Sequence, residues 1–308
     1  MVTFKLKTQY IFFLIFCVLL TSCSRERAPL GTEKNPVKLF FVPSVDAKVI
    51  EDKSKDIKKF LEANTPYKFK VGIPTSYVAV VESFGTERAD VASLNTFGYI
   101  MANEKYGVEA KMTVIRYGQS TYKAQIIARK DSGINSIKDI DGKKFAFVDP
   151  ASTSGYLLPM KLLKENKVKP SQETFAYKHD NVVSMVYQGQ VDAGATFYSP
   201  IEEGKIQDAR RLVLKQYPDV EDVVKIVQLS DSIPNDPFVF RKGVDPVMVK
   251  AIVDAFFKYI KTEEGKKNFH ALYGVTEFKL ATDADYDPVR EMLKTLGKSA
   301  MGLVKKKK

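Results

Sequence analysis

The segment spanning residues 147–159 places three consecutive hydroxyl side chains where a strand gives way to a helix. Its sequence is Phe-Val-Asp-Pro-Ala-Ser-Thr-Ser-Gly-Tyr-Leu-Leu-Pro, in which the Asp-Pro pair ends the strand. The first N–H groups of a helix are free and carry a partial positive charge, and hydroxyl groups beside them can donate to an anion. Ser152, Thr153 and Ser154 could therefore surround a tetrahedral oxyanion, with Gly155 allowing the backbone to come close. Capping of the helix by a single hydroxyl is the alternative.

The amino-terminal residues are typical of an export signal that ends in a lipidation site. Lys5 and Lys7 precede an unbroken apolar run over residues 10–20, which is too short to span a bilayer as a mature helix. The run ends in Leu-Thr-Ser-Cys23, which resembles the bacterial lipobox. We therefore expect residues 1–22 to be removed as a lipoprotein signal peptide and Cys23 to carry the lipid anchor. A plain signal peptide that happens to contain a cysteine is the alternative.

The predicted mature chain lacks the residues that most hydrolases need. Cys17 lies in the segment that we expect to be removed and Cys23 is the proposed lipidation site, which excludes thiol catalysis and cysteine metal sites. His179 and His270 are the only histidines, which excludes a histidine-rich metal site. The sequence has no Gly-x-Ser-x-Gly elbow, Walker A loop or His-Glu-x-x-His motif. We expect no catalytic residue, no metal and no cofactor. An exported enzyme with the fold that is predicted below is the alternative.

The chain is basic, and its ends are polar. Removal of the signal takes away two lysines and no acid, so the formal charge falls from +11 to +9. On an exported protein such a charge attracts anions, and the export signal argues against a nucleic-acid partner. Residues 23–36 are polar with Pro and Gly and predict a flexible tether. The lysine run at residues 305–308 predicts a solvated tail.

Strand-like and helix-like segments alternate through the body, which predicts an α/β protein with parallel sheets and crossover helices. The mature chain is too long for one typical core, so we expect two lobes joined by two crossings that act as a hinge. The first lobe would hold residues 37–122 plus 228–308, and the second residues 123–227. The main predicted strands cover residues 37–42, 69–73, 88–92, 111–117, 123–129, 144–148, 191–197 and 226–229. The predicted helices cover residues 48–63, 77–85, 97–105, 136–142, 154–166, 181–188, 246–259 and 286–296.

The hydroxyl segment resembles the signature of the phosphate-, phosphite- and phosphonate-binding proteins of ABC transporters. That signature is a strand followed by D-P-x-S-T-S-G-x-x-x-P, and residues 149–159 match it throughout. A His-Asp pair at residues 179–180, a Gly-Gln-Val-Asp-Ala-Gly-Ala run at 189–195 and a Pro-Asn-Asp-Pro block within 233–241 resemble further blocks of the family. The resemblance implies a two-lobed periplasmic-binding-protein fold of type II, with a ligand cleft between lobes that a two-strand hinge joins.

The same resemblance suggests roles for four more side chains. His179 would donate a ring N–H to the anion. Asp236, held between two prolines, would accept a proton from a P–OH group, which would favour a protonated oxyanion over fully ionised sulfate. Tyr77 and Tyr122 would each donate a hydroxyl. The alternatives are a structural histidine, a turn-forming aspartate and ordinary packing tyrosines.

One departure from the family bears on the ligand. Members that prefer aminoalkylphosphonates carry an acidic group after the Val-Asp-Ala-Gly strand, whereas residues 196–200 read Thr-Phe-Tyr-Ser-Pro, with no carboxylate before Glu202. The expected ligand therefore lacks an amine and is phosphite, methylphosphonate or phosphate. Asn95 and Thr96, after the strand at 88–92, could also reach the cleft.

Together these features predict an extracytoplasmic (periplasmic) lipoprotein that is anchored to the membrane through its lipid. We expect a monomer that captures a small phosphorus oxyanion and hands it to an ABC permease. A binding lipoprotein that acts as a sensor remains a second alternative.

Overall fold

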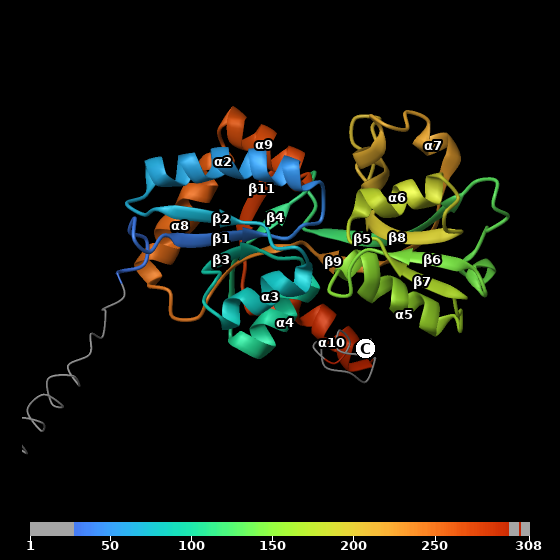
Figure 1. The fold of residues 1–308 in the computed structure, drawn as a ribbon, viewed down its shortest axis with the longest axis horizontal. Helices are drawn as coiled ribbons and strands as arrows, with labels where there is room; N and C mark the ends of the chain where they lie inside the picture. The colour runs from blue at the N-terminus through green and yellow to red at the C-terminus, as the bar shows by residue number, and fades with distance from the viewer. Residues whose placement is uncertain (1–27, 296–301, 303–308) are drawn as a thin grey trace, which may run out of the picture.

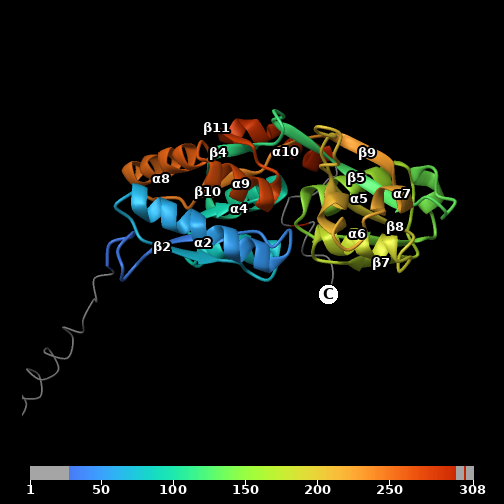
Figure 2. The same cartoon turned by 90° about the horizontal axis from the view of Figure 1, so that it is seen from above.

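The computed structural model describes residues 28–295 and residue 302, and it forms two α/β lobes that lie side by side (Figures 1 and 2). Each lobe is built on one twisted sheet with helices on both faces. The expected signal peptide, Cys23 and the lysine tail at 305–308 lie outside the described residues. Within the described part of the chain, no helix is both long enough and apolar enough to cross a membrane.

The first lobe contains a six-stranded sheet in the order β11-β4-β10-β3-β1-β2. β1 runs parallel to β2 and β3, whereas β10 and β11 run antiparallel to their neighbours. Helices α2 and α9 cover one face and α3 and α4 the other (Figure 1). The strands are β1 (Val37–Phe41), β2 (Phe69–Gly72), β3 (Val91–Ser93), β4 (Glu109–Ile115), β10 (Pro237–Phe240) and β11 (Glu277–Leu280). The helices are α2 (Ala47–Asn64), α3 (Tyr77–Gly85), α4 (Thr96–Tyr106), α8 (Pro246–Tyr259), α9 (Glu263–Tyr273), η4 (Asp283–Tyr286) and α10 (Asp287–Thr295).

The second lobe contains a five-stranded sheet in the order β7-β6-β8-β5-β9. β6 runs parallel to β7 and β8, and β5 runs antiparallel to β8 and β9. The strands are β5 (Thr121–Arg129), β6 (Lys144–Phe147), β7 (Gln172–Phe175), β8 (Ala193–Tyr198) and β9 (Val224–Pro234). The helices are η1 (Ile137–Ile140), the π-helical η2 (Thr153–Leu157), α5 (Leu158–Glu165), α6 (His179–Tyr187), η3 (Ala209–Val213) and α7 (Val220–Val223).

Two neighbouring connections join the lobes. Residues 116–120 lead from β4 to β5, and residues 235–236 lead from β9 to β10. Asn235 ties them together, because its N–H donates to Ser120 O at 3.0 Å and its side chain donates to Gln119 O at 2.7 Å. The sequence places the return crossing after residue 227, but β9 stays paired with β5 as far as Pro234. We therefore propose residues 121–234 as the second lobe.

Apolar periodicity predicts the α/β class correctly but not every element. Helices α3 and α8 have the predicted bounds, because each begins at a clear start signal and carries an apolar stripe. The expectation of parallel sheets is wrong in part, since both sheets are mixed. Strands β7, β10 and β11 and helix α9 escape prediction, because each strand is only four residues long and α9 is largely polar.

The predicted flexible tether at residues 23–36 is wrong over the part that the structure describes. Residues 28–36 form a turn in which Gly31 N donates to Asn35 O at 2.8 Å, and Lys68 N donates to Gly31 O at 2.8 Å. Gly31 has φ +89°, and a Cβ there would lie 2.7 Å from the Tyr67 ring. A close approach and a left-handed backbone therefore both require glycine, and the segment is attached to the first lobe.

Candidate functional site

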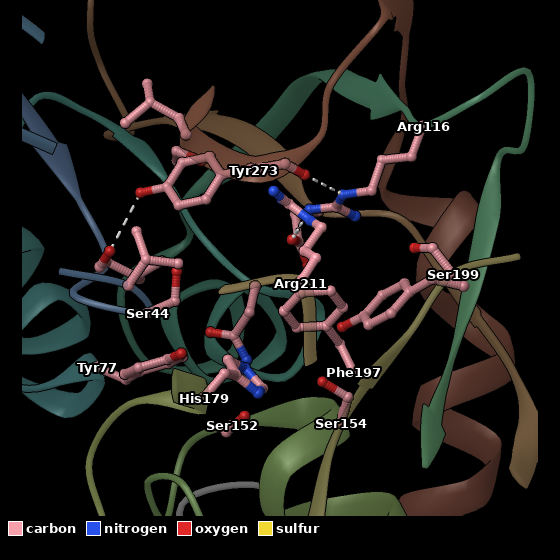
Figure 3. Close-up of a pocket in the computed structure, with 17 residues that line it drawn as sticks. Ser44, Tyr77, Arg116, Ser152, Ser154, His179, Phe197, Ser199, Arg211 and Tyr273 are labelled. Carbon is pink, nitrogen blue, oxygen red and sulfur yellow. Dashed lines mark hydrogen bonds and ion pairs between the residues drawn. The ribbon is translucent and has the colours of Figure 1, made fainter. Parts of the chain in front are cut away.

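A polar cavity of about 60 Å³ lies between the lobes (Figure 3). A bound water needs about 10–15 Å³ on this measure, so the cavity has room for a small ion. The first lobe contributes Ser44 and Tyr77, the second contributes Ser152, Ser154 and other side chains, and the two connections also reach the cavity wall. The cavity therefore lies where both lobes and both connections meet.

The hydroxyl segment forms one wall of the cavity. Ser152 and Ser154 both line it and are 2% and 3% exposed. Ser152 is also the helix cap, because its Oγ accepts from Gly155 N at 3.0 Å. The first turn is π-helical, with Leu157 N donating to Ser152 O, which leaves the N–H of Ser154 outside the helical ladder. Capping and anion donation are therefore compatible here, since the capping oxygen accepts while its own O–H remains available to donate.

Thr153 faces the other lobe rather than the cavity. Its Oγ1 accepts from Phe97 N at 2.9 Å and from Asn95 Nδ2 at 2.9 Å. Phe97 lies in the first turn of α4, whose N-cap Asn95 makes no side-chain cap bond, so Thr153 caps that helix from across the interface. The structure thus leaves Thr153 outside the cavity lining, because its hydroxyl group lies between the lobes.

Gly155 is required by packing rather than by approach to an anion. A Cβ at this position would lie 2.4 Å from Val148 Cγ2 and 2.9 Å from Ser152 Oγ. The Gly155 N–H is also already committed to Ser152. The predicted role of Gly155, to let the backbone come close to the anion, is therefore not needed to explain this glycine, which lets the turn close on strand β6.

Tyr77 and Tyr122 bring phenol groups to the cavity from α3 and β5. Burial raises the pKa of Tyr77 well above its ordinary value, and the charge of Asp149 adds to the rise. Burial likewise raises the pKa of Tyr122, with a further contribution from Asp236. Both phenols are therefore protonated donors at neutral pH. The Tyr77 hydroxyl is buried and has no hydrogen-bond partner among the described residues.

His179 is the first residue of α6 and lines the cavity with its ring against Phe197, at a centroid distance of 5.0 Å. Burial, helped by the positive charge of Arg116, lowers its pKa to about 3. The imidazole is therefore neutral and has one N–H to donate. Its Nδ1 is buried and has no partner within residues 28–295.

Asp236 is paired with Arg116, a residue that the sequence does not single out. Arg116 Nη2 lies 2.5 Å from Asp236 Oδ2, Nη1 donates to Asn235 Oδ1 at 3.0 Å and Nε donates to Tyr273 O at 2.8 Å. The guanidinium also lies 5.3 Å from the Tyr122 ring centroid. Asp236 Oδ1 is buried and makes no hydrogen bond to any described residue, so it can still accept one. The pair is nearly neutral, which lowers the repulsion between this carboxylate and a bound anion.

Other lining residues also lie outside the sequence prediction. Ser199 follows β8, Tyr273 ends α9 and Arg211 lies on η3 (Figure 3). None belongs to a motif with a fixed spacing, and Arg211 directly follows another arginine. These residues can be identified only by their position on segments that turn toward the interface, and that position is known only once the fold is known. Asn95 does reach the cavity, although its amide donates to Thr153 and to Ala151 O.

The assembled site suits binding of an anion. Hydroxyl, phenol and imidazole donors converge on it, together with one buried carboxylate oxygen that lacks a partner. Among the described residues, no hydrogen bond joins the imidazole ring of His179 to a serine hydroxyl, so the arrangement does not resemble an activated nucleophile. In the same part of the chain, no group of three or more His, Cys, Asp or Glu side chains could hold a metal ion.

Two mixed α/β lobes with two crossing connections and a polar cavity between them define the class of periplasmic binding proteins. Solved structures share this fold. PhnD1 of Prochlorococcus marinus in complex with methylphosphonate superposes with a TM-score of 0.73 at 18% identity, covering 85% of this chain and 98% of that one. A binding protein component of an ABC phosphonate transporter from Pseudomonas aeruginosa gives a TM-score of 0.73 at 24% identity, covering 84% and 87%.

The chain belongs to the family of periplasmic substrate-binding proteins of phosphonate ABC transporters, whose profile matches residues 39–286. It is similar to the phosphate-import protein PhnD of Mycolicibacterium smegmatis, with 29% identity over 91% of this chain and 93% of the relative. The phosphonates-binding periplasmic protein of Escherichia coli is 26% identical over 70% of this chain and 63% of its own length. Members of this family bind substrates for transport and are not enzymes, and they act outside the cytoplasm.

Proposed function

We propose that this protein binds a small tetrahedral phosphorus oxyanion that carries at least one P–OH proton, and that it delivers the ion to an ABC permease. The observation that supports this most is a group of buried polar atoms around one cavity that have no partner among the described residues. It includes Tyr77 Oη, His179 Nδ1 and Asp236 Oδ1. Buried polar groups are nearly always hydrogen-bonded, so such a set indicates a ligand.

The donors and the acceptor have different tasks in this proposal. Ser152, Ser154, Tyr77 and Tyr122 donate to the unprotonated oxygens, and His179 donates from its neutral ring. The free Asp236 oxygen accepts from the P–OH group. Near neutral pH phosphate always carries such a proton, and phosphite and methylphosphonate carry it in a substantial fraction of their ions, whereas sulfate does not. Among the relatives, one is named for phosphate import and one is solved with methylphosphonate, which agrees with this ligand class.

Binding in this proposal requires the lobes to part and close again. The lining residues Ser152, Ser154 and His179 are only 2%, 3% and 5% exposed, so a ligand that contacts them is largely enclosed. The connections at residues 116–120 and 235–236 are short and adjacent, which suits them to a hinge. They also carry Arg116 and Asp236, which lie in the cavity wall. Closure around the ion then presents the surface that docks on the permease.

We also propose that Cys23 anchors the protein to the membrane through its lipid. The support is the Leu-Thr-Ser-Cys23 sequence at the end of the apolar signal. Replacement of Cys23 by Ser should move the protein from the membrane fraction to the soluble extracytoplasmic fraction after cell fractionation. An unchanged distribution would show that the protein is held to the membrane by another means.

The binding proposal is tested by titration calorimetry of the purified chain with five ligands. Phosphite, methylphosphonate and phosphate should bind, whereas sulfate should bind at least about 100-fold more weakly, because it leaves the Asp236 oxygen buried opposite another acceptor. Aminoethylphosphonate should also bind weakly, since no carboxylate follows β8 before Glu202. Failure of all three protonated oxyanions to bind, or tight binding of sulfate, would refute the proposal.

A further inference from the structure

Two consecutive arginines of η3 have opposite surroundings. Arg210 is buried in the second lobe, where its guanidinium meets Asp208 at 2.8 and 3.0 Å and donates to Val224 O at 2.9 Å. Arg211 lines the interlobe cavity, and its buried Nε has no partner among the described residues. No carboxylate of the described residues lies within ion-pair distance of Arg211. The fold thus compensates the charge of Arg210 but not that of Arg211.

Arg211 lies at the end of the cavity away from the hydroxyl segment. A Cβ on Gly274 would lie 3.5 Å from Arg211 Nη2, and Gly274 directly follows the cavity residue Tyr273. Burial lowers the pKa of Arg211, and the charge of Arg116 lowers it further, so the two guanidinium groups are close enough to repel each other. In Figure 3, Ser152 and Ser154 lie along one edge of the cavity and Arg116 and Tyr273 along the opposite one.

The charge of the cavity is therefore uneven. In Figure 3, His179 lies next to Ser152, and its imidazole is neutral. At the opposite edge, Arg116 is balanced by Asp236, whereas Arg211 carries a positive charge without a carboxylate partner among the described residues. An arginine in that state is stabilised by an anionic or hydrogen-bond-accepting group and destabilised by a second cation.

We propose that Arg211 is a specificity-determining residue that selects the substituent on phosphorus by its charge. This inference rests on the proposed function. The part of the cavity beside Arg211 accepts an anionic or oxygen-bearing substituent, as in phosphonocarboxylates, and rejects the ammonium group of aminoalkylphosphonates. The missing carboxylate after β8 explains only why an ammonium group finds no support, whereas Arg211 repels it. The charged end of the ligand would contact the second lobe through η3 while its phosphorus group contacts η2.

The test compares three ligands that share a P–C–C skeleton and differ in the terminal group: ethylphosphonate, phosphonoacetate and 2-aminoethylphosphonate. Calorimetry with the wild-type chain should give the tightest binding for phosphonoacetate and the weakest for 2-aminoethylphosphonate, with about 10- to 100-fold between ethylphosphonate and each extreme. Methylphosphonate serves as the reference for the hydroxyl end.

Two substitutions then assign the effect to Arg211. Arg211→Gln should bring the three affinities to within about 5-fold of one another, and Arg211→Glu should reverse their order. Arg290→Gln, on the surface helix α10, is the matched loss of one positive charge and should leave the order unchanged. Thermal unfolding of each variant verifies that it is folded.

The outcomes separate this inference from the proposed function. If methylphosphonate binds but none of the P–C–C ligands does, or if the order persists in Arg211→Gln, the role of Arg211 is wrong and the proposed function stands. If methylphosphonate, phosphite and phosphate all fail to bind the wild-type chain, the proposed function itself is wrong.

Discussion

Substitution of Thr153 by Val tests whether this hydroxyl serves closure rather than ligand contact. Valine keeps the branched shape of threonine but cannot accept the bonds from Phe97 N and Asn95 Nδ2, each 2.9 Å long. Asn95 retains its bond to Ala151 O at 2.8 Å, so the main loss is the buried N–H at the start of α4. A lost cap or an unsatisfied buried donor costs about 1–3 kcal/mol.

The cost falls on the closed form alone, because both bonds join the two lobes. If the ligand is held by the closed form, a loss of about 2 kcal/mol weakens the apparent affinity by about 30-fold. The fold-loss of affinity should be the same for phosphite, methylphosphonate and phosphate, because the lost hydrogen bonds do not involve the ligand. Titration calorimetry measures the affinities, and small-angle X-ray scattering should show that saturating ligand is needed to reach the compact form.

Thr153→Ser is the matched control, because it keeps the hydroxyl and should bind within about 3-fold of the wild-type chain. If Thr153→Val binds as tightly as the wild type, the interlobe bonds contribute nothing to closure. If its loss differs strongly among phosphite, methylphosphonate and phosphate, Thr153 contacts the ligand directly, and the separation of roles within the hydroxyl segment is wrong.

Three further substitutions probe the cavity itself. Ser154→Ala should lower the affinity for methylphosphonate about 10-fold or more in calorimetry while leaving the melting temperature within about 2 °C, because it removes one hydrogen bond to a charged group. Asp236→Asn should reduce discrimination against sulfate, since it removes the acceptor charge and releases Arg116; an unchanged affinity ratio would contradict the acceptor role. His179→Gln should reduce the pH dependence of the free energy of unfolding, measured by urea denaturation. The pKa of His179 in the folded protein, about 3, lies below its ordinary value of 6.5. The wild type therefore loses up to about 1.4 kcal/mol of its free energy of unfolding per pH unit as the pH falls below 6.5.

The fold class follows from local signals, whereas the strand pairing does not. Helix α8 begins at a proline after a capping aspartate and carries a continuous apolar stripe, so its bounds can be read from the sequence. Strand β10 is only Pro-Phe-Val-Phe, yet it occupies an inner position in the first sheet between β3 and β4. That position depends on pairing with strands more than a hundred residues away, which a local pattern does not encode.

The site was partly predictable for a similar reason. Ser152 and Ser154 stand in a contiguous motif at a strand end, and the structure places both in the cavity wall. Arg116 sits at the end of a strand in a connection between lobes, where its three partners come from residues 235, 236 and 273. Arg211 is marked by a buried Nε that has no partner among the described residues, which is a property of the folded molecule. Residues defined by what surrounds them are therefore the ones that the sequence does not reveal.

The order of the three hydroxyl residues connects recognition with closure. Ser152 and Ser154 line the cavity, and Thr153 between them points across the interface to α4, because successive residues of a helical turn point in different directions. A ligand that displaces the flanking serines by an ångström would stretch the 2.9 Å bond from Phe97 N beyond hydrogen-bonding distance. An ill-fitting ion is then penalised twice, by its own contacts and by the lost interlobe bond. Selectivity in this site should accordingly exceed what the ligand contacts alone provide. Thr153→Val should reduce the ratio of affinities between a well-fitting ligand and a poor one, wherever the poor ligand displaces the turn that carries Ser152 and Ser154.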